Sequence, residues 1–333
     1  VYHWFMRPED YQAALDHRYD DTTEPAVFAY NGVVYDSVQC RIRGGASRGW
    51  AKANWRFEFP QGHPLEDPDR FSRPVDVIWL MSNWSDKSYV RQILSYETFR
   101  DAGAAYSEAF SVRLHKDGAF YGLYTYVESQ GDDYVWRNGL EDTAARYKTY
   151  QNNSSDCRYF SASQLPSYYE KKQRLFEGYQ DLDDFLWGIN FLTDQARRDF
   201  VFDHVDIPTT INSRAAQCII HNTDRSWHNS ILYRDSEGTQ RWTKHAYDMD
   251  LTLGRNCCPV LNDDVYGDRD ILGSATPSHP LLNDSDHPDP VGNGWNRFTD
   301  AMHDVPELRA MYFRRLRTLM DDLLAFGYYE NLS

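Results

Sequence analysis

The sequence lacks the features that define several large classes of protein. No window of its 333 residues approaches the roughly 20 consecutive apolar residues that a membrane-spanning helix needs. It has 35 Lys and Arg against 50 Asp and Glu and no basic stripe, which argues against a nucleic-acid partner. It contains neither a G-x-S-x-G nucleophile elbow nor a Walker-A phosphate loop. The net charge of −15 favours a basic partner by electrostatic steering, although solubility alone also accounts for it.

Cysteine is scarce and scattered. No C-x-x-C pair and no paired histidines at zinc-ligand spacing are present, which argues against a zinc ribbon. The five cysteines are Cys40, Cys157, Cys218, Cys257 and Cys258. One or two disulfides with an odd thiol would suit an oxidising compartment, and buried free thiols are the alternative. The sequence given holds no signal peptide and begins without Met, so a leader outside it remains compatible with secretion.

Strand signals dominate the first 130 residues. Residues 27–60 alternate apolar and polar side chains, which predicts an antiparallel sheet with one buried face. The pair Asn31-Gly32 predicts a hairpin turn, and Gly44-Gly45 predicts a break between two strands. The 24 Tyr, 17 Phe and 10 Trp of the whole chain predict thick aromatic packing more than a ligand platform.

A helix and a second hairpin complete this first part. Asp86 is predicted to be the N-cap of a helix over 87–102, which Gly103 ends. Residues 109–128 predict another hairpin. The stretch 1–130 is therefore expected to form strands, a helix and strands again, as a small β-rich lobe.

Helical patterns dominate residues 131–333, which are expected to form a larger lobe. Residues 138–180 are polar and irregular, and 255–297 predict a long excursion rich in Asp, Asn, Pro and Gly. The other predicted elements are helices over 183–204, 208–221 and 306–325 and a strand pair at 230–233 and 241–244. The predicted fold class is α+β, with an antiparallel β-rich N-lobe and a mostly helical C-lobe.

An acidic and amide motif lies between a predicted helix and a predicted strand. Asp224 precedes Asn229 at the spacing of the protein-kinase catalytic loop. In such a loop the carboxylate accepts or orients the proton of the substrate hydroxyl, and the amide oxygen binds magnesium. Alone the motif is weak evidence, because Asp and Asn in loops more often cap turns.

Two further carboxylates follow in the sequence. Asp248 and Asp250 stand at i and i+2 after the second strand of the predicted pair. Such a pair suits a divalent cation that bridges phosphate oxygens, as the D-F-G aspartate does in kinases. The order and separation of Asp224, Asn229 and Asp248 together predict a metal–nucleotide site.

Basic residues surround the glycine break upstream. They are Arg43, Lys52 and Arg56, and Ser47 adds a hydroxyl group. Backbone N–H groups approach a phosphate closely where no side chain blocks them, so this segment is a candidate phosphate cradle. By composition alone, a turn with solvent-facing basic residues explains it equally well.

A series of motifs in order resembles the CotH (spore coat protein H) kinase family. They are Arg41-x-Arg43-Gly44-x-x-Ser47 with Lys52, Asn83-Trp84-x-Asp86 with Arg91, Tyr121-Gly122-Leu123-Tyr124 with Glu128, Asn222-x-Asp224-x-x-x-His228-Asn229, and Trp242 followed by Tyr247-Asp248-x-Asp250-x-x-x-Gly254. The family usually has Trp where this chain has Tyr247, and no key carboxylate is missing. The motifs are specific only in combination.

The resemblance implies one atypical protein-kinase-like domain of two lobes that binds ATP with Mg²⁺, or with Mn²⁺, and phosphorylates Ser or Thr of a protein. It assigns catalysis to Asp224 and metal binding to Asn229, Asp248 and Asp250. The residues that it assigns to the nucleotide are Arg43, Ser47, Lys52, Arg56, Arg91, Glu128 and Trp242, the last against the adenine. Whether Lys52 or Arg56 holds the phosphates stays open. It also implies a secreted, envelope or spore-coat location, and the acidic surface favours a basic, Ser-rich protein substrate.

Three other functions remain as alternatives. The same metal cradle would serve transfer of AMP instead of phosphate, which the mass of the product distinguishes. A glycosyltransferase using Asp248-x-Asp250 for manganese predicts an alternating βαβ pattern upstream, and the predicted hairpins speak against it. A surface adhesin that has kept only the fold would bind no nucleotide.

Overall fold

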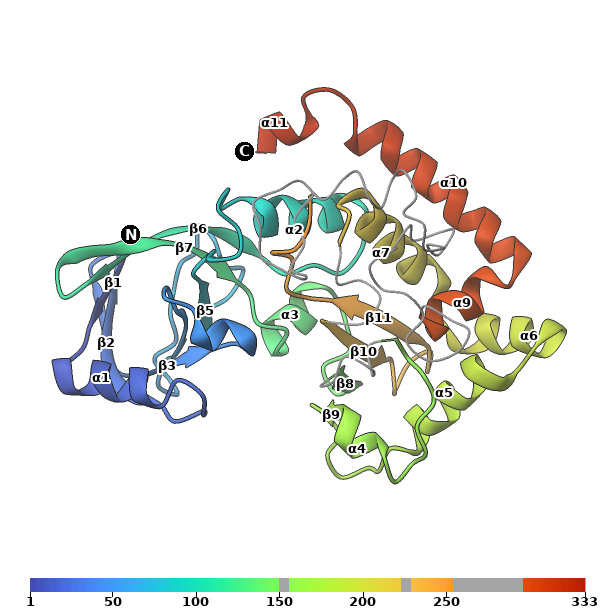
Figure 1. The fold of residues 1–333 in the computed structure, drawn as a ribbon, viewed down its shortest axis with the longest axis horizontal. Helices are drawn as coiled ribbons and strands as arrows, with labels where there is room; N and C mark the ends of the chain where they lie inside the picture. The colour runs from blue at the N-terminus through green and yellow to red at the C-terminus, as the bar shows by residue number, and fades with distance from the viewer. Residues whose placement is uncertain (150–155, 223–228, 254–295, 333) are drawn as a thin grey trace. The chain divides into compact units, whose positions relative to one another are not determined.

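The chain divides into two compact units. The computed structural model describes residues 1–149, 156–222, 229–253 and 296–332, which are coloured in Figure 1. The strand-rich unit comprises Val1–Tyr96 and Ser107–Gly139, and the helix-rich unit comprises Glu97–Tyr106 and Leu140–Ser333. The mixed α+β class predicted from the sequence is confirmed. The strand-rich unit extends to Gly139, past the predicted lobe boundary at residue 130.

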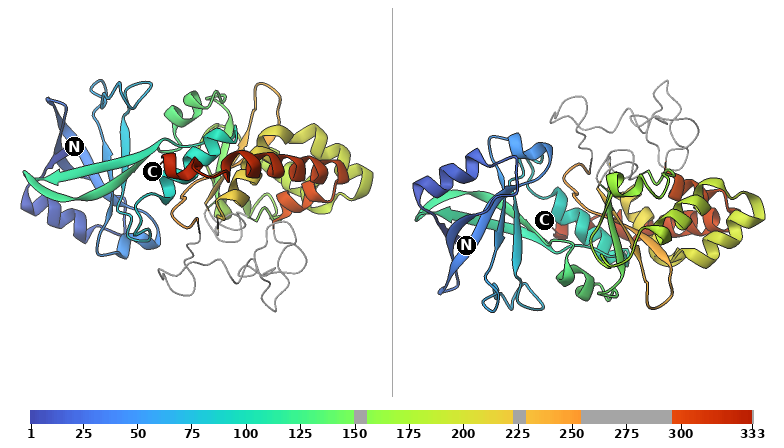
Figure 2. Two further views of the ribbon diagram at one scale, coloured as in Figure 1. Left: turned by 90° about the horizontal axis from the view of Figure 1, so that it is seen from above. Right: turned by 90° about the horizontal axis from the view of Figure 1, so that it is seen from below.

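A closed seven-stranded sheet forms the strand-rich unit, every residue of which the structure describes (Figures 1 and 2). Its strands are β1 (Tyr2–Phe5), β2 (Glu24–Tyr30), β3 (Val33–Arg43), β4 (Asn54–Glu58), β5 (Val77–Met81), β6 (Ala109–Lys116) and β7 (Ala119–Val127). Helices α1 (Pro8–Asp16) and α3 (Asp132–Arg137) and the short 3₁₀ helix η1 (Ala46–Gly49) accompany them. The strand order is β1-β2-β3-β4-β5-β7-β6, and the parallel pair β1–β6 closes the sheet.

Both predicted hairpins are confirmed, and their turns explain why. Asn31 and Gly32 join β2 to β3 with φ values of 50° and 81°, and Asp117 and Gly118 join β6 to β7 with 51° and 84°. Two-residue turns with φ > 0 at both positions match the twist of the strands that they connect. Asn, Asp and Gly are the residues that adopt this conformation most readily.

Aromatic rings fill the core of the strand-rich unit. The ring of Trp4 lies with its centroid 4.6 Å from that of Trp55 and 5.4 Å from that of Phe57. Phe28 packs edge-on against Phe57 at 5.3 Å. All four side chains are completely buried. The abundance of aromatic residues therefore serves packing in this unit, as the sequence predicted.

Helix α2 (Arg91–Asp101) begins four residues later than predicted. Tyr89 has a φ of 64°, a left-handed conformation that no α-helix contains, so the helix cannot begin before it. The buried carboxylate of Asp86 accepts hydrogen bonds from the backbone N–H groups of Ser88 and Arg91, both at 3.0 Å. Asp86 thus anchors the turn that leads into the helix instead of capping it directly.

A four-stranded antiparallel sheet and a set of helices form the helix-rich unit. The strands are β8 (Ala145–Thr149), β9 (Tyr169–Lys171), β10 (Ser230–Arg234) and β11 (Trp242–Ala246), in the order β11-β10-β8-β9. The helices are α4 (Leu165–Tyr168), α5 (Gln180–Phe191), α6 (Asp194–His204), α7 (Ile207–Ile219), α9 (Arg297–His303), α10 (Pro306–Leu323) and α11 (Tyr328–Leu332). The segment predicted to be irregular, 138–180, therefore supplies two strands of this sheet.

Most of the helical predictions for this unit are confirmed. The predicted helix over 183–204 is two helices, because the chain adopts extended dihedral angles at Leu192 and Thr193. The carboxylate of Asp206 caps α7 by accepting from the backbone N–H of Thr209. The predicted excursion over 255–297 lies almost entirely outside the described residues.

The helix-rich unit has its own hydrophobic core. Trp242 of β11 stacks on Phe185 of α5, with ring centroids 4.6 Å apart and an interplanar angle of 16°. Phe298 of α9 meets Phe185 edge-on at 5.4 Å. Helix α5 therefore packs against the sheet through Phe185, and α9 packs against α5 through Phe298.

The predictions on disulfides and on membrane-spanning helices can be compared with the described residues only. There, no disulfide joins Cys40, Cys157 and Cys218 to one another, and Cys257 and Cys258 lie outside the described part. Among the helices placed by the structure, none combines the length and the apolar composition that crossing a membrane requires.

Candidate functional site

The pairing of β10 with β11 brings two of the predicted metal ligands together. Ser230 is paired with Ala246 in this hairpin. One residue further out, the backbone N–H of Tyr247 donates to the carbonyl of Asn229 at 3.0 Å. Asp248 follows Tyr247 directly, so Asn229 and Asp248 lie at the same end of the hairpin.

The end of α7 is tied to the same segment. The backbone N–H of Leu253 donates to the carbonyl of Ile220 at 2.7 Å. The amide Nδ2 of buried Asn222 donates to the sulfur of Met249 at 3.4 Å. Asp224, the predicted catalytic residue, lies outside the described residues. The described residues on both sides of it, Asn222 and Asn229, contact the 247–253 segment.

Left-handed backbone conformations cluster around this end of the hairpin. The φ values are 50° at His221, 53° at Asn229, 62° at Asp248 and 51° at Leu253. Asn and Asp adopt this conformation more readily than other residues with a side chain, whereas Leu does so at a cost. Such conformations persist where the surrounding structure determines them, and they concentrate at functional sites.

The donors at this end of the hairpin suit a hard divalent cation. Asp248 and Asp250 supply carboxylate oxygens, and Asn229 supplies an amide oxygen, which are the ligand types that Mg²⁺ prefers. No cluster of three or more His, Cys, Asp or Glu side chains with metal-ligand geometry occurs in the part of the chain that the structure describes. Mg²⁺ is commonly held by one or two carboxylates together with substrate phosphates and water.

Trp242 does not have the position predicted for it. Its side chain is 2% exposed, and Phe185 covers one face of the indole. The ring of Tyr147 lies 5.9 Å away, in a near-parallel orientation. A ring so enclosed has no surface to offer to an adenine, so the predicted adenine contact is not supported, and Trp242 is a core residue.

The predicted basic residues of the strand-rich unit have partners within that unit. The guanidinium of Arg43 lies 3.8 Å above the ring of Trp79. Arg56 forms an ion pair with Glu58 at 2.8 Å. Arg91 is paired with the fully buried carboxylate of Asp86. These contacts give the three arginines structural roles in addition to any role in ligand binding.

Lys52 has a different environment from the arginines. Its ammonium donates to the carbonyl oxygens of Ser82, at 2.8 Å, and of Leu123. It also lies 4.9 Å from the ring centre of Tyr89 and 4.4 Å from that of Tyr124. Burial, with a smaller effect of the nearby Lys87 charge, lowers the pKa of Lys52 to about 8. Three motifs that were separate in the sequence therefore meet at this ammonium.

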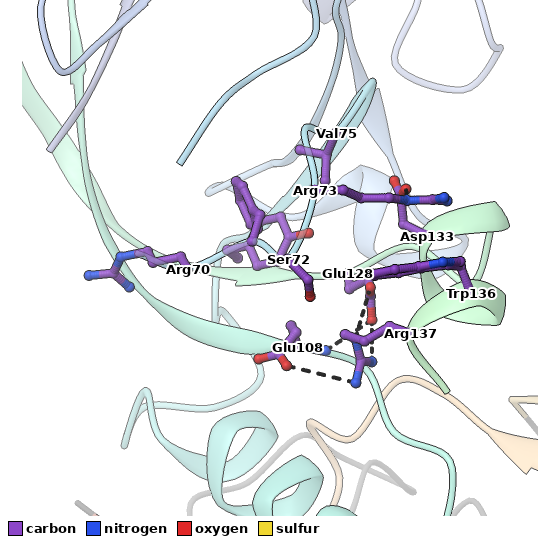
Figure 3. Close-up of a pocket in the computed structure, with 11 residues that line it drawn as sticks. Arg70, Ser72, Arg73, Val75, Glu108, Glu128, Asp133, Trp136 and Arg137 are labelled. Atoms are coloured by element: carbon purple, nitrogen blue, oxygen red, sulfur yellow. Dashed lines mark hydrogen bonds and ion pairs between the residues drawn. The ribbon is translucent and has the colours of Figure 1, made fainter. Parts of the chain in front are cut away.

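Glu128 lines a pocket of the strand-rich unit (Figure 3). Its carboxylate is paired with Arg137 of α3 at 2.5 Å and accepts a hydrogen bond from the backbone N–H of Glu108 at 3.1 Å. Burial raises the pKa of Glu128 despite these contacts. Arg73 and Asp133 form a second ion pair in the same pocket at 2.6 Å. Because the carboxylates of Glu128 and Asp133 are both paired with arginines of this pocket, we assign Glu128 to a structural ion pair.

Two residues of the strand-rich unit were missed from the sequence. Asn54 is 2% exposed and bonds to both Ser47 and Ser82. Ser82 is completely buried and connects Asn54 to Lys52 through its peptide groups. The only sequence feature that could have indicated Asn54 is that it is an uncharged polar residue at the start of a predicted strand, followed by apolar and charged residues. That signal was too common to single out Asn54.

Comparison with known proteins agrees with these observations. The model of the family described as CotH kinase protein matches residues 40–332. The chain is also 26% identical to the inner spore coat protein H of Bacillus subtilis (strain 168) over an alignment 334 positions long, which covers 99% of this chain and 83% of that protein. The matched region contains both the glycine segment of the strand-rich unit and the Asn229–Asp248 end of the hairpin. The chain therefore belongs to the CotH kinase protein family.

Proposed function

We propose that this protein is a Mg²⁺-dependent atypical protein kinase that transfers the γ-phosphate of ATP to Ser or Thr of a protein. The observation that carries the proposal is the juxtaposition of Asn229 and Asp248, made by the β10–β11 pairing just after α7. Membership of a family described as kinase proteins supports the reaction class. The proposal includes a kinase-like arrangement of a strand-rich and a helix-rich lobe.

Each residue of the site has a defined task in this proposal. Asp248 and Asn229 would hold the cation, and Asp250 would add a carboxylate to the same loop. Bound Mg²⁺ would neutralise negative charge on the phosphate oxygens of ATP. Asp224 would orient the acceptor hydroxyl and accept its proton, which is the task of the catalytic-loop aspartate in kinases.

The substrate and the location are parts of the same proposal. The similar Bacillus subtilis protein is named as an inner spore coat protein. We therefore assign this chain to a coat or other secreted or envelope layer. Its net charge of −15 favours a basic, Ser-rich protein as the acceptor.

Nucleotide binding is the first test. Mg²⁺ with the non-hydrolysable analogue AMP-PNP should raise the melting temperature, because a ligand at a hundred times its Kd adds about 2.7 kcal/mol of stability. Asp248→Asn should abolish the shift while keeping the left-handed backbone, since Asn accepts the φ of 62° that Ala would strain. Asp203→Asn, at an exposed position of α6, is the matched control and should shift as the unchanged protein does.

Phosphate transfer is the second test. Incubation with γ-³²P-ATP and a basic Ser-rich peptide should label the peptide, and Asp224→Asn and Asp248→Asn should each lower the rate by about a thousandfold. Asn229→Gly removes the amide oxygen without strain at a φ of 53° and should raise the Mg²⁺ requirement. Absence of any thermal shift and of any labelling in the unchanged protein would contradict the proposal. A gain of AMP mass instead of phosphate would identify adenylyl transfer.

A further inference from the structure

The connection from β3 to β4 lies between Arg43 and the buried Asn54, which are paired across the two strands. Asn54 is the first residue of β4 and is paired with Arg43, the last residue of β3. Its Nδ2 donates to the Oγ of Ser47 at 3.2 Å, inside the connection. Its Oδ1 accepts from the backbone N–H of Ser82 at 2.7 Å, just beyond the end of β5. One side chain therefore ties the 44–53 loop to a neighbouring strand.

The glycine turn that precedes Ser47 packs closely against its side chain. A Cβ on Gly44 would lie 1.9 Å from the Oγ of Ser47, and Gly44 has a φ of 124°. Both facts require glycine at this position. The carbonyl of Gly44 accepts from Nε of Arg48 at 2.7 Å, which closes the turn. Gly45 and Ala46 are exposed at its tip, so their backbone is open to a ligand.

Lys52 is hydrogen-bonded to Ser82, the residue just beyond β5 that also bonds to Asn54. The N–H of Ser82 bonds to Asn54, and the carbonyl of Ser82 accepts from the ammonium of Lys52 at 2.8 Å. The lysine side chain lies close to Gly122, where a Cβ would be only 3.3 Å from the Cε of Lys52. The glycine turn, through Ser47 and Asn54, and the ammonium of Lys52 are thus both hydrogen-bonded to Ser82.

We propose that Asn54 is the positioning residue of a phosphate-binding loop, holding the 44–53 backbone and Lys52 in the conformation that receives the phosphates of the nucleotide. This inference rests on the proposed function. An amide suits the position because it offers a donor and an acceptor on one rigid plane, toward Ser47 and Ser82 respectively. Asn54 itself is buried and does not touch the ligand; it acts through Ser47 and through Ser82.

The test separates phosphate recognition from binding of the nucleoside. Titration calorimetry would give the Kd of Mg²⁺–AMP-PNP and of adenosine for the unchanged protein, Asn54→Ala, Ser47→Ala and the double variant. We expect each variant to bind AMP-PNP about tenfold more weakly and adenosine within about twofold of the unchanged protein. The double variant should be no weaker than Asn54→Ala, because Ser47 acts through its hydrogen bond to Asn54, which that variant already lacks.

A matched control removes one hydrogen bond elsewhere in the same unit. The hydroxyl of Tyr35, near the start of β3, accepts from the backbone N–H of Glu66 at 3.2 Å. Tyr35→Phe should lower the melting temperature and leave the ratio of the two Kd values unchanged. If Asn54→Ala fails to fold, Ser47→Ala, at a half-buried position, decides the question.

The outcomes distinguish this inference from the proposed function. If the unchanged protein binds AMP-PNP but both variants keep its ratio of Kd values, the inference is wrong and the proposed function stands. Equal weakening of AMP-PNP and adenosine would show that Asn54 is only structural, which also overturns the inference. If the unchanged protein binds no nucleotide, it is the proposed function that fails.

Discussion

The two units hold their predicted site residues by different means. In the strand-rich unit, side chains do the holding: Asn54 fixes Ser47, and Lys52 binds two carbonyl groups. In the helix-rich unit, backbone hydrogen bonds place the segments, from Tyr247 to Asn229 and from Leu253 to the end of α7. A side-chain substitution is therefore expected to disturb geometry in the first unit, whereas in the second it can remove chemistry and leave the backbone in place.

This difference decides which variants are informative. At Asp248 and Asn229, the left-handed backbone accepts Asn or Gly, so the charge or the amide can be removed cleanly. At Asn54 no substitution removes one hydrogen bond without affecting the loop, so ratios of affinities are needed. The predictions below compare the two units further, from the largest expected effect to the smallest.

The largest expected effect is the loss of a central tryptophan from either core. Trp55 is completely buried in the strand-rich unit, and Trp242 is 2% exposed in the helix-rich unit. Trp55→Ala and Trp242→Ala should each lower the free energy of unfolding by about 3–5 kcal/mol, because each leaves a large cavity. Urea denaturation, followed by far-UV circular dichroism, measures both losses.

Trp242 also tests whether its corrected role holds. As a core residue it should tolerate Trp242→Phe with a lowered melting temperature and an unchanged Kd for AMP-PNP. A variant that kept its stability but lost nucleotide affinity would restore the adenine contact. Trp55→Phe is the matched control in the other unit and should lose stability only.

Turn chemistry made part of the fold predictable from the sequence. Asn31-Gly32 predicted the first hairpin, because few residues other than Asn, Asp and Gly adopt φ > 0 without strain, and Asp117-Gly118 forms the turn of the second in the same way. The spacing of Asn229 and Asp248 predicted that they share a site, since each flanks a strand of one short hairpin. Local rules of this kind work when neighbours in space are also close in sequence.

The remaining features depend on contacts between distant parts of the chain. Strand β8 carries Arg146 and Lys148 and was predicted to be irregular, yet it pairs with both β10 and β9. Arg146 is only 6% exposed, enclosed by neighbours that the sequence pattern does not reveal. Asn54 was missed for the same reason, because its partner Ser82 lies in another part of the sequence. No periodicity of a single segment encodes such pairs.

The next prediction concerns acid stability, which should distinguish the units. His245 of β11 is 5% exposed, and burial lowers its pKa to about 4 from the ordinary value of 6.5. Between these values the unfolded chain binds a proton that the folded protein does not. Stability should therefore fall as the pH drops from about 6.5 to about 4, by up to about 3 kcal/mol.

His245→Gln is the variant that isolates this effect. Gln keeps a polar group near the hydroxyl of Thr243, which lies 2.7 Å from Nε2 of His245, but it does not titrate. Urea midpoints measured from pH 4 to 7 should be flatter for His245→Gln than for the unchanged protein. An alkaline series cannot separate the units, because burial lowers the pKa of Lys52 and of Lys244, one in each unit, to about 8. Identical acid profiles would show that His245 binds its proton as readily in the folded protein as in the unfolded chain, contrary to this prediction.

The smallest expected effect compares two glycines. In the helix-rich unit, a Cβ on Gly188 of α5 would lie 2.1 Å from the ring tip of Phe200. Gly188→Ala should cost about 1–3 kcal/mol from this overlap, less about 1 kcal/mol regained from helix propensity. In the strand-rich unit, Gly44→Ala should cost a similar amount, because it meets Ser47 and must also adopt a φ of 124°.

Second-site substitutions separate the two causes. Phe200→Leu shortens the side chain that the added methyl group of Gly188→Ala would meet, and it should recover most of the stability lost in that variant. Ser47→Gly removes the atom that opposes a Cβ at Gly44 but leaves its φ of 124°, so it should recover little. Melting temperatures of the four single and two double variants measure both recoveries. Full recovery of Gly44→Ala by Ser47→Gly would mean that the turn relaxes freely, and the β3–β4 loop would then not be the rigid element that Asn54 is proposed to hold.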